Sequence, residues 1–258
     1  MTTERSGSGD LRLTLKLLWG KPARPSRGPK PGLTLDQIVT TAIAIADADG
    51  LPALSMRRVA TELGVGTMSL YRYVPGKAEL LDLMLDQVSG PGDTAERAAG
   101  LGWRALMDLV AHCTWDLYVK HPWLLQINWA RPVLGPNSLA GVELVQRGLG
   151  GLGLSDQERV MVMFVVDSFV IGAARGYVNA RSAGATSELS DEEFWAVQGP
   201  AMEEALGSGA YPTLAVMAED AFDFSQEQAF DFGLGRLLDG LDAYLAERRG
   251  PEPANSPP

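Results

Sequence analysis

The chain has 258 residues, of which 46% are hydrophobic and 21% charged, and its formal net charge is −10 at pH 7. This length exceeds the usual size of one domain and the composition is globular, so two folded domains are expected. A single cysteine, Cys113, excludes an internal disulfide framework. No apolar run reaches the roughly 18 residues of a membrane span, and residues 1–10 lack the apolar stretch of a secretory signal. We therefore expect a cytoplasmic protein that does not contact a membrane.

The charges are unevenly distributed along the chain. Residues 1–87 hold 11 Lys or Arg against 9 Asp or Glu, whereas residues 88–258 hold 11 against 23. Only the N-terminal part therefore suits a phosphate backbone. Residues 1–33 are basic and, from residue 20 onward, rich in proline and glycine, which predicts a flexible arm. Arg27 and Lys30 lie near the folded domain and are candidates for DNA contact, the alternative being a solvated tail.

A helix is predicted to begin after Thr34. Thr34 and Gln37 have the spacing of a capping box, in which each side chain accepts a hydrogen bond from the other residue's backbone. Apolar residues then recur at helical spacing until Gly50, a residue suited to ending a helix.

Two short helices and a fourth helix follow. Ser55 is a typical N-cap, and Gly64 supplies the left-handed conformation that ends the second helix. The third helix is predicted over residues 67–73, before Pro75-Gly76, and a fourth begins near Lys77. Two short helices around a glycine-containing turn, braced by a preceding helix, are typical of a helix-turn-helix, so residues 34–88 are predicted to form a DNA-binding domain.

The rest of the chain has helical periodicity and little strand-like alternation. Helices are expected at 101–120, 122–130, 137–150, 155–182, 190–206 and 226–248. The predicted fold is therefore all-α, with a larger helical domain over residues 95–248 and a disordered, proline-rich tail over residues 249–258.

Three segments carry a family resemblance. Residues 51–81 (LPALSMRRVATELGVGTMSLYRYVPGKAELL) resemble the DNA-binding domain of the tetracycline-repressor, or TetR, family. Residues 230–246 (FDFGLGRLLDGLDAYLA) resemble the last helix of its tetracycline-repressor-type C-terminal domain, and the His121-Pro122-Trp123 junction also fits that group. The resemblance covers about residues 34–248. It implies a ligand-responsive transcriptional repressor that binds a palindromic double-stranded operator as a homodimer and is released by a small-molecule effector.

The resemblance also assigns DNA-contacting positions. Because Leu70 and Val74 should face the core, the opposite side of the third helix should face DNA. The matching positions are Arg57, Thr67, Met68, Ser69, Tyr71, Arg72, Tyr73 and Lys77.

A cavity for a flat, partly apolar effector is expected in the larger domain, because tryptophan and tyrosine residues gather between residues 103 and 129. The predicted lining residues are Trp103, His112, Trp115, Tyr118, Trp129, Phe164 and Asp167. Each aromatic alone fits a core position better than a cavity wall, and it is as a group that they indicate a cavity. The two histidines, His112 and His121, have no evident place in the metal arrangement of tetracycline repressors. We therefore predict no metal site, no cofactor and no tetracycline binding.

The dimer is predicted to combine helices 155–182 and 226–248, through small residues at Gly172–Gly176 and an apolar stripe at Phe230–Leu241. Two alternatives stay open. One is a DNA-binding dimer without ligand control, and the other is an all-helical enzyme acting on an apolar substrate. The enzyme has no support in a nucleophile, metal cluster or phosphate loop, and His112 and Cys113 point about 100° apart on a helix.

Overall fold

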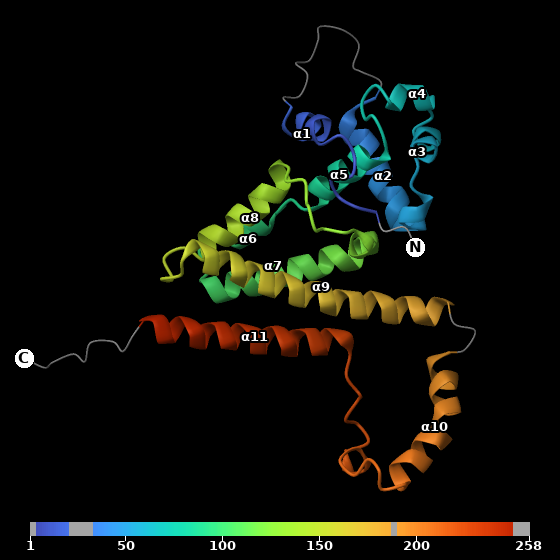
Figure 1. Ribbon diagram of the computed structural model, residues 1–258, viewed down its shortest axis with the longest axis vertical. Helices are drawn as coiled ribbons and strands as arrows, with labels where there is room; N and C mark the ends of the chain where they lie inside the picture. Colours follow the sequence, from blue (N-terminus) through green and yellow to red (C-terminus); the bar gives the residue numbers. More distant parts are fainter. Residues whose placement is uncertain (1–3, 21–32, 187–189, 250–258) are drawn as a thin grey trace, which may run out of the picture.

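The computed structural model describes residues 4–20, 33–186 and 190–249, and this part of the chain is helical throughout, as predicted (Figure 1). One isolated β-bridge, between Arg5 and Asn128, is the exception among these residues. The end of the chain, residues 250–258, which includes most of the predicted tail, lies outside the described residues.

The helix-turn-helix region folds as the local signals predict. Its elements are α2 (Leu35–Asp49), the 3₁₀ turn η1 (Leu51–Ala53), α3 (Met56–Glu62), α4 (Thr67–Leu70) and α5 (Lys77–Val88). Thr34 and Gln37 form the capping box, Ser55 accepts a hydrogen bond from the Arg58 N–H, and Gly64 has a φ of 66°. The helix predicted over residues 67–73 ends at Leu70 and continues as a turn, which places Val74 in the core beside Leu70.

The larger domain contains α6 (Thr94–Arg97), α7 (Trp103–Lys120), the 3₁₀ turn η2 (Pro122–Gln126), α8 (Pro136–Gly148), α9 (Asp156–Thr186), α10 (Asp191–Gly207), the 3₁₀ turn η3 (Leu214–Val216) and α11 (Gln226–Arg249). Helices α7, α9 and α11 pack together as the body of this domain. The helix predicted over residues 122–130 is wrong beyond Gln126. The backbone N–H and C=O of Asn128 pair with Glu4 and Ser6 instead of continuing a helix.

The prediction of a flexible arm over residues 1–33 is wrong for residues 4–20. Asp10 accepts hydrogen bonds from the N–H groups of Arg12 and Leu13 and so caps helix α1 (Leu11–Trp19). This helix packs on α5, with Leu17 and Leu18 against the hydrophobic core, because its apolar residues recur at helical spacing. Residues 21–32, with Arg27 and Lys30, lie outside the described residues.

Helix α9 has a higher mean hydropathy than its sequence suggested, because charged residues interrupt its apolar stretches. Its segment Asp156–Ser182 is long enough to cross a membrane and its most apolar 18-residue window has a mean hydropathy of 1.5, although only 22% of that window is buried. A core helix of a soluble protein can have the same composition. Here α9 packs against α7, α8 and α11, so its apolarity has a structural use within the domain.

Candidate nucleic-acid interface and ligand pocket

The predicted reading surface is the outer face of α3 and α4. Met68 and Tyr71 have 77% and 43% of their surface exposed, and the arginines Arg57 and Arg72 are exposed as well. Thr67 and Ser69 are half-exposed, in positions suited to polar contacts with a phosphate or base edge. The seventh predicted member, Tyr73, is half-buried and packs against the core. These placements agree with an outward face opposite Leu70.

Lys77 has a partner in the protein. Its Nζ lies 2.8 Å from the Glu4 Oε1 atom, so the N-terminal segment neutralises the first residue of α5. A DNA phosphate at this position would have to compete with the Glu4 carboxylate. This pair could not be predicted from the sequence, because the two residues are far apart in the chain.

Substitution of Arg72 tests the reading surface most directly. Arg72→Ala should keep the fold, because the side chain is exposed and makes no hydrogen bond or ion pair with the described residues. If Arg72 contacts a base, affinity for the operator should fall by about 1–3 kcal/mol, with the loss concentrated at one base pair of each half-site. Fluorescence anisotropy at fixed salt measures this, with Arg58→Ala, which breaks a pair with Asp49, as the matched control. Unchanged affinity of Arg72→Ala would remove Arg72 from the interface.

A row of buried carboxylates on α5 holds two other segments in place. Glu79, Asp82 and Asp86 recur at helical spacing and so share one face of the helix. Glu79 accepts a hydrogen bond from the Asp10 N–H at 2.8 Å. Asp86 accepts from the backbone N–H and the hydroxyl of Ser138, both at 2.9 Å, in the first turn of α8. Gly135 lets the backbone approach Asp86 closely, because a Cβ there would overlap the carboxylate.

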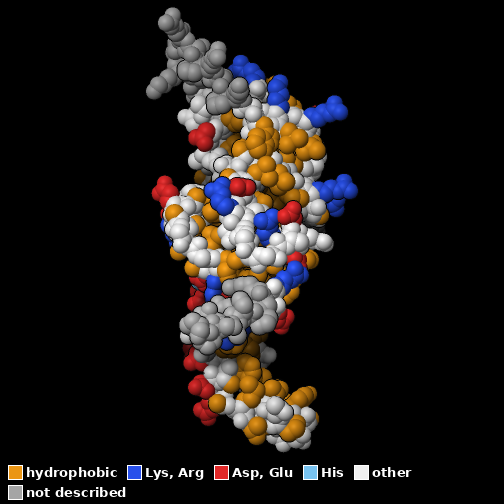
Figure 2. All heavy atoms as spheres, turned by 90° about the vertical axis from the view of Figure 1, so that its left-hand side faces the viewer, with side chains coloured by type: hydrophobic (Ala, Val, Ile, Leu, Met, Phe, Trp, Pro, Cys, Tyr) orange, Lys and Arg blue, Asp and Glu red, His pale blue; other side chains and the backbone are white. Residues whose placement is uncertain are grey.

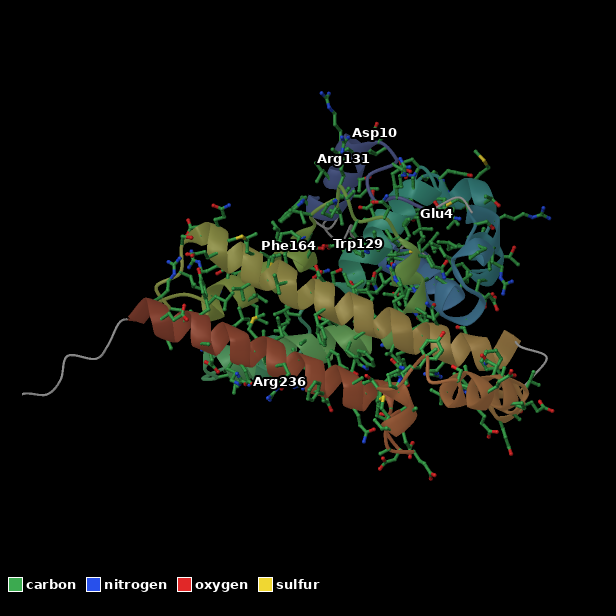
Figure 3. All side chains as sticks on the ribbon, turned by 60° about the horizontal axis from the view of Figure 1, so that its bottom comes forward. Glu4, Asp10, Trp129, Arg131, Phe164 and Arg236 are labelled. Carbon is green, nitrogen blue, oxygen red and sulfur yellow. The ribbon has the colours of Figure 1, made fainter. Side chains whose placement is uncertain are left out.

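Asp82 is the centre of this row. It accepts hydrogen bonds from the Ser6 hydroxyl at 2.9 Å and the Gly7 N–H at 3.0 Å, and the Ser6 Oγ accepts from the Val133 N–H at 3.1 Å. Burial raises the pKa of Asp82, and the hydrogen bonds from Gly7 and Ser6 offset this only in part. Residues 4–10 therefore connect α5 to the loop that contains Val133. Figure 3 labels Asp10 in the N-terminal segment and Arg131 in this loop.

A second set of hydrogen bonds joins the two domains, between α2 and the His121–Trp123 segment. The Asp47 Oδ1 atom, on α2, lies 2.6 Å from His121 Nδ1 and accepts a hydrogen bond from Trp123 Nε1 at 2.7 Å. The His-Pro-Trp sequence that contributed to the family resemblance therefore connects the larger domain to α2. This is the first helix of the predicted DNA-binding domain over residues 34–88, called the reading domain below.

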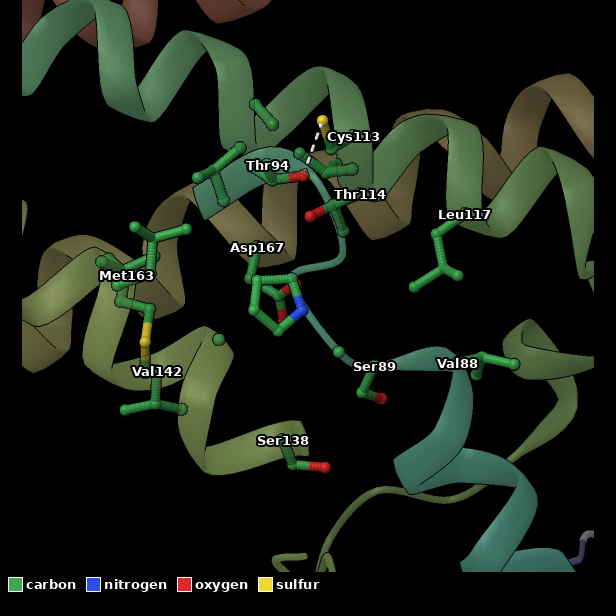
Figure 4. A pocket seen from close by; sticks show the side chains of 18 of the residues that line it. Val88, Ser89, Thr94, Cys113, Thr114, Leu117, Ser138, Val142, Met163 and Asp167 are labelled. Atoms are coloured by element: carbon green, nitrogen blue, oxygen red, sulfur yellow. Dashed lines mark hydrogen bonds between the residues drawn. The ribbon is translucent and has the colours of Figure 1, made fainter. Parts of the chain in front are cut away.

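A cavity of about 560 Å³ lies where α5 meets the larger domain (Figure 4). Its walls come from the end of α5, the linker over residues 89–93, α6, α7, the loop over residues 129–134, α8 and α9. Its volume is within the range of small-molecule sites. Polar groups, among them Ser89, Thr94, Thr114 and Ser138, are interspersed with aliphatic side chains such as Leu117 and Val142. Apolar walls with a few polar groups are typical of ligand pockets.

The structure brings three of the seven predicted lining residues to this cavity: Trp129, Phe164 and Asp167. Trp115 and Tyr118 are buried in the core and are not among the lining residues, so their assignment to the cavity wall is wrong. Trp115 packs against Phe230, with ring centroids 4.4 Å apart and ring planes tilted by 31°. Aromatic residues in a core and aromatic residues in a cavity wall recur with the same helical period. The sequence pattern alone therefore could not distinguish these two positions.

Trp103 and His112 border a separate hollow between α7 and α11, so they too are misplaced in the prediction. His112 Nε2 lies 3.2 Å from the Asp231 carboxylate, and its Nδ1 lies 2.9 Å from the Asp108 carbonyl oxygen. Burial lowers the pKa of His112, but the hydrogen bonds with Asp108 and Asp231 outweigh this effect and raise it. Across the described residues, no group of three His, Cys, Asp or Glu side chains is placed to hold a metal ion.

Residues that the sequence analysis did not single out form most of the cavity wall. They include the end of α5 at Leu85 and Val88, the linker, and the α8 face around Val142. The glycines and proline of residues 90–92 indicated a loop, but only the tertiary fold shows that this loop lies against α7.

Two family models match the chain in sequence order. Residues 38–84 match the family described as "Bacterial regulatory proteins, tetR family", and residues 98–245 match "Tetracyclin repressor-like, C-terminal domain". The chain is 52% identical over 251 residues to the HTH-type transcriptional repressor DrrR1 of Streptomyces coeruleorubidus, which covers 96% of this chain and 92% of DrrR1. It is 25% identical over 224 residues to the tetracycline repressor protein class E of Escherichia coli, covering 84% and 94% of the two chains.

Solved structures agree with this result. The TetR family protein ActR of Streptomyces coelicolor, in complex with actinorhodin, superposes with a TM-score of 0.64 at 30% identity, covering 84% of this chain and 99% of ActR. Apo ActR superposes with a TM-score of 0.61 at 28% identity, covering 85% and 99%. These relatives are regulators, which gives the enzyme alternative no support. The reading domain, the helical C-terminal domain and these similarities establish that the chain belongs to the tetR family, as a helix-turn-helix transcriptional repressor.

Proposed function

We propose that this repressor binds a palindromic operator as a homodimer in the cytoplasm, and that a small, partly apolar effector releases it by filling the cavity. One observation carries the proposal. Helix α5 begins at Lys77, beside the reading surface, and ends at Leu85 and Val88 in the cavity wall. A ligand in the cavity therefore contacts the helix that supports the reading domain.

The mechanism requires two arrangements of the reading domains. A ligand shifts such an equilibrium only by binding one arrangement better than the other. Because α5 is a rigid element with buried carboxylates along one face, pressure on its last turn would move the whole reading domain rather than one side chain. The effector would favour the arrangement in which the two recognition helices no longer match successive major grooves.

The cavity favours effector control over the alternative in which the larger domain only dimerises. ActR, a relative with the same fold, is solved with actinorhodin bound. We infer a ligand of similar general kind for this chain, with a flat polycyclic body.

The homodimer is supported by apolar surface that a single chain leaves uncovered. On α9, Met161 and Val165 are half-exposed and Gly172 has open space around it, so one stripe of this helix can accept a close neighbour. The Phe230–Leu241 stripe of α11, however, is not available for this purpose. Phe230, Leu234 and Leu238 are buried within the single chain, and Leu237 and Leu241 pack against its core. That part of the predicted dimer face is wrong, and we now place the interface on the α9 stripe and on the outer face of α11 at Phe232, which is 71% exposed.

A second uncovered surface lies on α10 and the segment that follows it. These elements stand away from the body of the molecule in Figure 1, and hydrophobic side chains gather there at the lower end of Figure 2. Exposed members include Trp195, Val197, Val216 and Phe222. An apolar surface of this kind is rarely left to solvent, so we expect a second copy of the chain to cover part of it.

Release of DNA by a ligand tests the proposal. A labelled DNA fragment from the region flanking the gene is bound to the full chain, and actinorhodin and other flat polycyclic compounds are added. We expect at least one compound to release the fragment from the wild-type protein. Val142→Trp, which places a large side chain in the cavity from α8, should bind DNA but respond to no ligand that the wild-type cavity accepts. Release that is equal in the wild-type and Val142→Trp proteins would contradict an effector site in this cavity.

A further inference from the structure

Asp167 is a charged residue of the cavity wall that has no partner in the described part of the chain and, unlike Asp116 and Lys120, is not exposed to solvent. It lies on α9 between Met163 and Val170, and Figure 4 places its side chain in the cavity near Thr94 and Thr114. Within the described part of the chain, no hydrogen bond or ion pair engages the Asp167 carboxylate. Two arginines of the same helix lie eight residues away on either side, and both are engaged elsewhere. Arg159 pairs with Asp156 at 2.5 Å, and Arg175 donates to the carbonyl oxygen of Leu125 at 3.3 Å.

The other charged residues of the cavity lining offset one another. Asp93 pairs with Arg97, with 3.9 Å between the Oδ1 and Nη1 atoms. Asp116 and Lys120 lie one turn apart on α7 and are both exposed, so solvent screens them. The Asp167 carboxylate therefore sets the sign of the local charge deep in the cavity.

Burial makes this isolated charge costly. It raises the pKa of Asp167, and the pKa of the nearby phenol of Tyr118 is raised by its own burial and by the negative charge of Asp167. A carboxylate in such a place is stabilised by a ligand that brings a positive charge and a hydrogen-bond donor, because a charge-assisted hydrogen bond is stronger where water is excluded. An anionic ligand would be repelled, and a neutral ligand would leave the desolvation cost in place.

We propose that the effector carries a basic nitrogen on its flat apolar body, and that Asp167 is the counter-ion that selects for it. This inference rests on the proposed function, since it concerns the same cavity. It adds the chemical class of the effector, a cationic polycyclic molecule, and assigns the selection to one residue.

The test compares two dyes of the same three-ring shape that differ in charge. The probes are 9-aminoacridine, a cation at neutral pH, and acridone, which is neutral. Their binding to the full chain is measured by fluorescence titration without DNA, so that intercalation does not contribute. The wild-type protein should bind 9-aminoacridine at least about tenfold more tightly than acridone, since a hydrogen bond to a charged group contributes about 1.5–3 kcal/mol.

Three variants separate the possible outcomes. Asp167→Asn keeps the shape of the side chain but removes its charge, and should lose the preference for the cation while keeping its affinity for acridone. Asp116→Asn removes a carboxylate at the exposed edge of the same cavity and should keep the preference. Val142→Trp should weaken binding of both dyes, which places them in the cavity.

A preference for 9-aminoacridine that survives in Asp167→Asn would overturn the assignment, as would equal binding of both dyes to the wild-type protein. These failures differ from failure of the proposed function. If Val142→Trp binds both dyes as tightly as the wild-type protein does, the cavity itself is not the effector site. If Val142→Trp weakens binding of both dyes but the wild-type protein does not prefer 9-aminoacridine, only the role of Asp167 is wrong.

Discussion

Val165→Glu should give a folded monomer that no longer binds an operator fragment. Val165 lies on the outer stripe of α9 with 48% of its surface exposed, and it is not part of the cavity wall. The free subunit therefore tolerates the change, because the carboxylate stays in water. In a dimer built on this stripe, two like charges would be brought together and desolvated, at a cost of about 3–5 kcal/mol for each uncompensated charge. One reading domain alone contacts too few base pairs for specific binding, so operator affinity should fall by more than about a hundredfold.

Light scattering at micromolar concentration, together with fluorescence anisotropy on the operator fragment, measures both effects. Leu139→Glu is the matched control, since it places a carboxylate at an exposed apolar position on α8, away from the proposed interface. The control should stay dimeric and bind DNA normally. A dimeric Val165→Glu protein with normal affinity would mean that the interface lies elsewhere, with the exposed face of α10 as the next candidate.

Local signals predicted the reading domain well. The capping box at Thr34, the cap at Ser55 and the left-handed Gly64 depend only on residues a few positions apart, so their structures follow directly from the sequence. The short third helix was predicted too long, because the turn that follows Leu70 has similar backbone angles and no breaking residue before Pro75.

Contacts between distant segments account for what the sequence could not predict. Helix α1 has only nine residues, and such a short helix is stable only through packing. Its support comes from Glu79 and Asp82, which lie about seventy residues further along the chain. The apolar stripe of α11 also depends on contacts that the sequence could not predict. Periodicity identified its apolar face, but could not tell whether α7 and α9 or a second subunit would cover that face.

The candidate cavity residues show the same difference between local signals and contacts of distant segments. Asp167 is a charge within an otherwise apolar helix, and such a charge needs a partner or a ligand when it is buried. This argument depends on one residue and its immediate neighbours. Trp115 and Tyr118 were assigned to the cavity because they are aromatic and close in sequence, and both are core residues instead. A charge within an apolar helix therefore indicates a cavity wall more specifically than aromatic residues that also suit the core.

Asp82→Ala should destabilise the protein by about 2–3 kcal/mol, or roughly 4–12 °C in Tm, because it leaves the Ser6 hydroxyl and the Gly7 N–H without their buried acceptor. The loss should be local. Hydrogen exchange should speed up in residues 4–20 and in the loop that contains Val133, which Ser6 holds by a hydrogen bond, while α2 and α3 keep their protection. If residues 4–20 stay protected in Asp82→Ala, packing of α1 on α5 is sufficient and the carboxylate is not needed.

Asp82→Asn separates the hydrogen bonds from the charge, since its amide oxygen still accepts from Ser6. Burial raises the pKa of Asp82 in the folded protein, so the folded state holds this proton more tightly than the unfolded chain. The contribution of this group to stability is therefore greatest at low pH and is lost as the pH rises from the unfolded value through the raised folded value. Denaturant titrations across this pH range should show the wild-type protein losing stability relative to Asp82→Asn as the pH rises. A difference between the two that does not change with pH would mean that the carboxylate titrates alike in the folded and unfolded chains, and that hydrogen bonding alone explains the position of residues 4–10 against α5 in the folded protein.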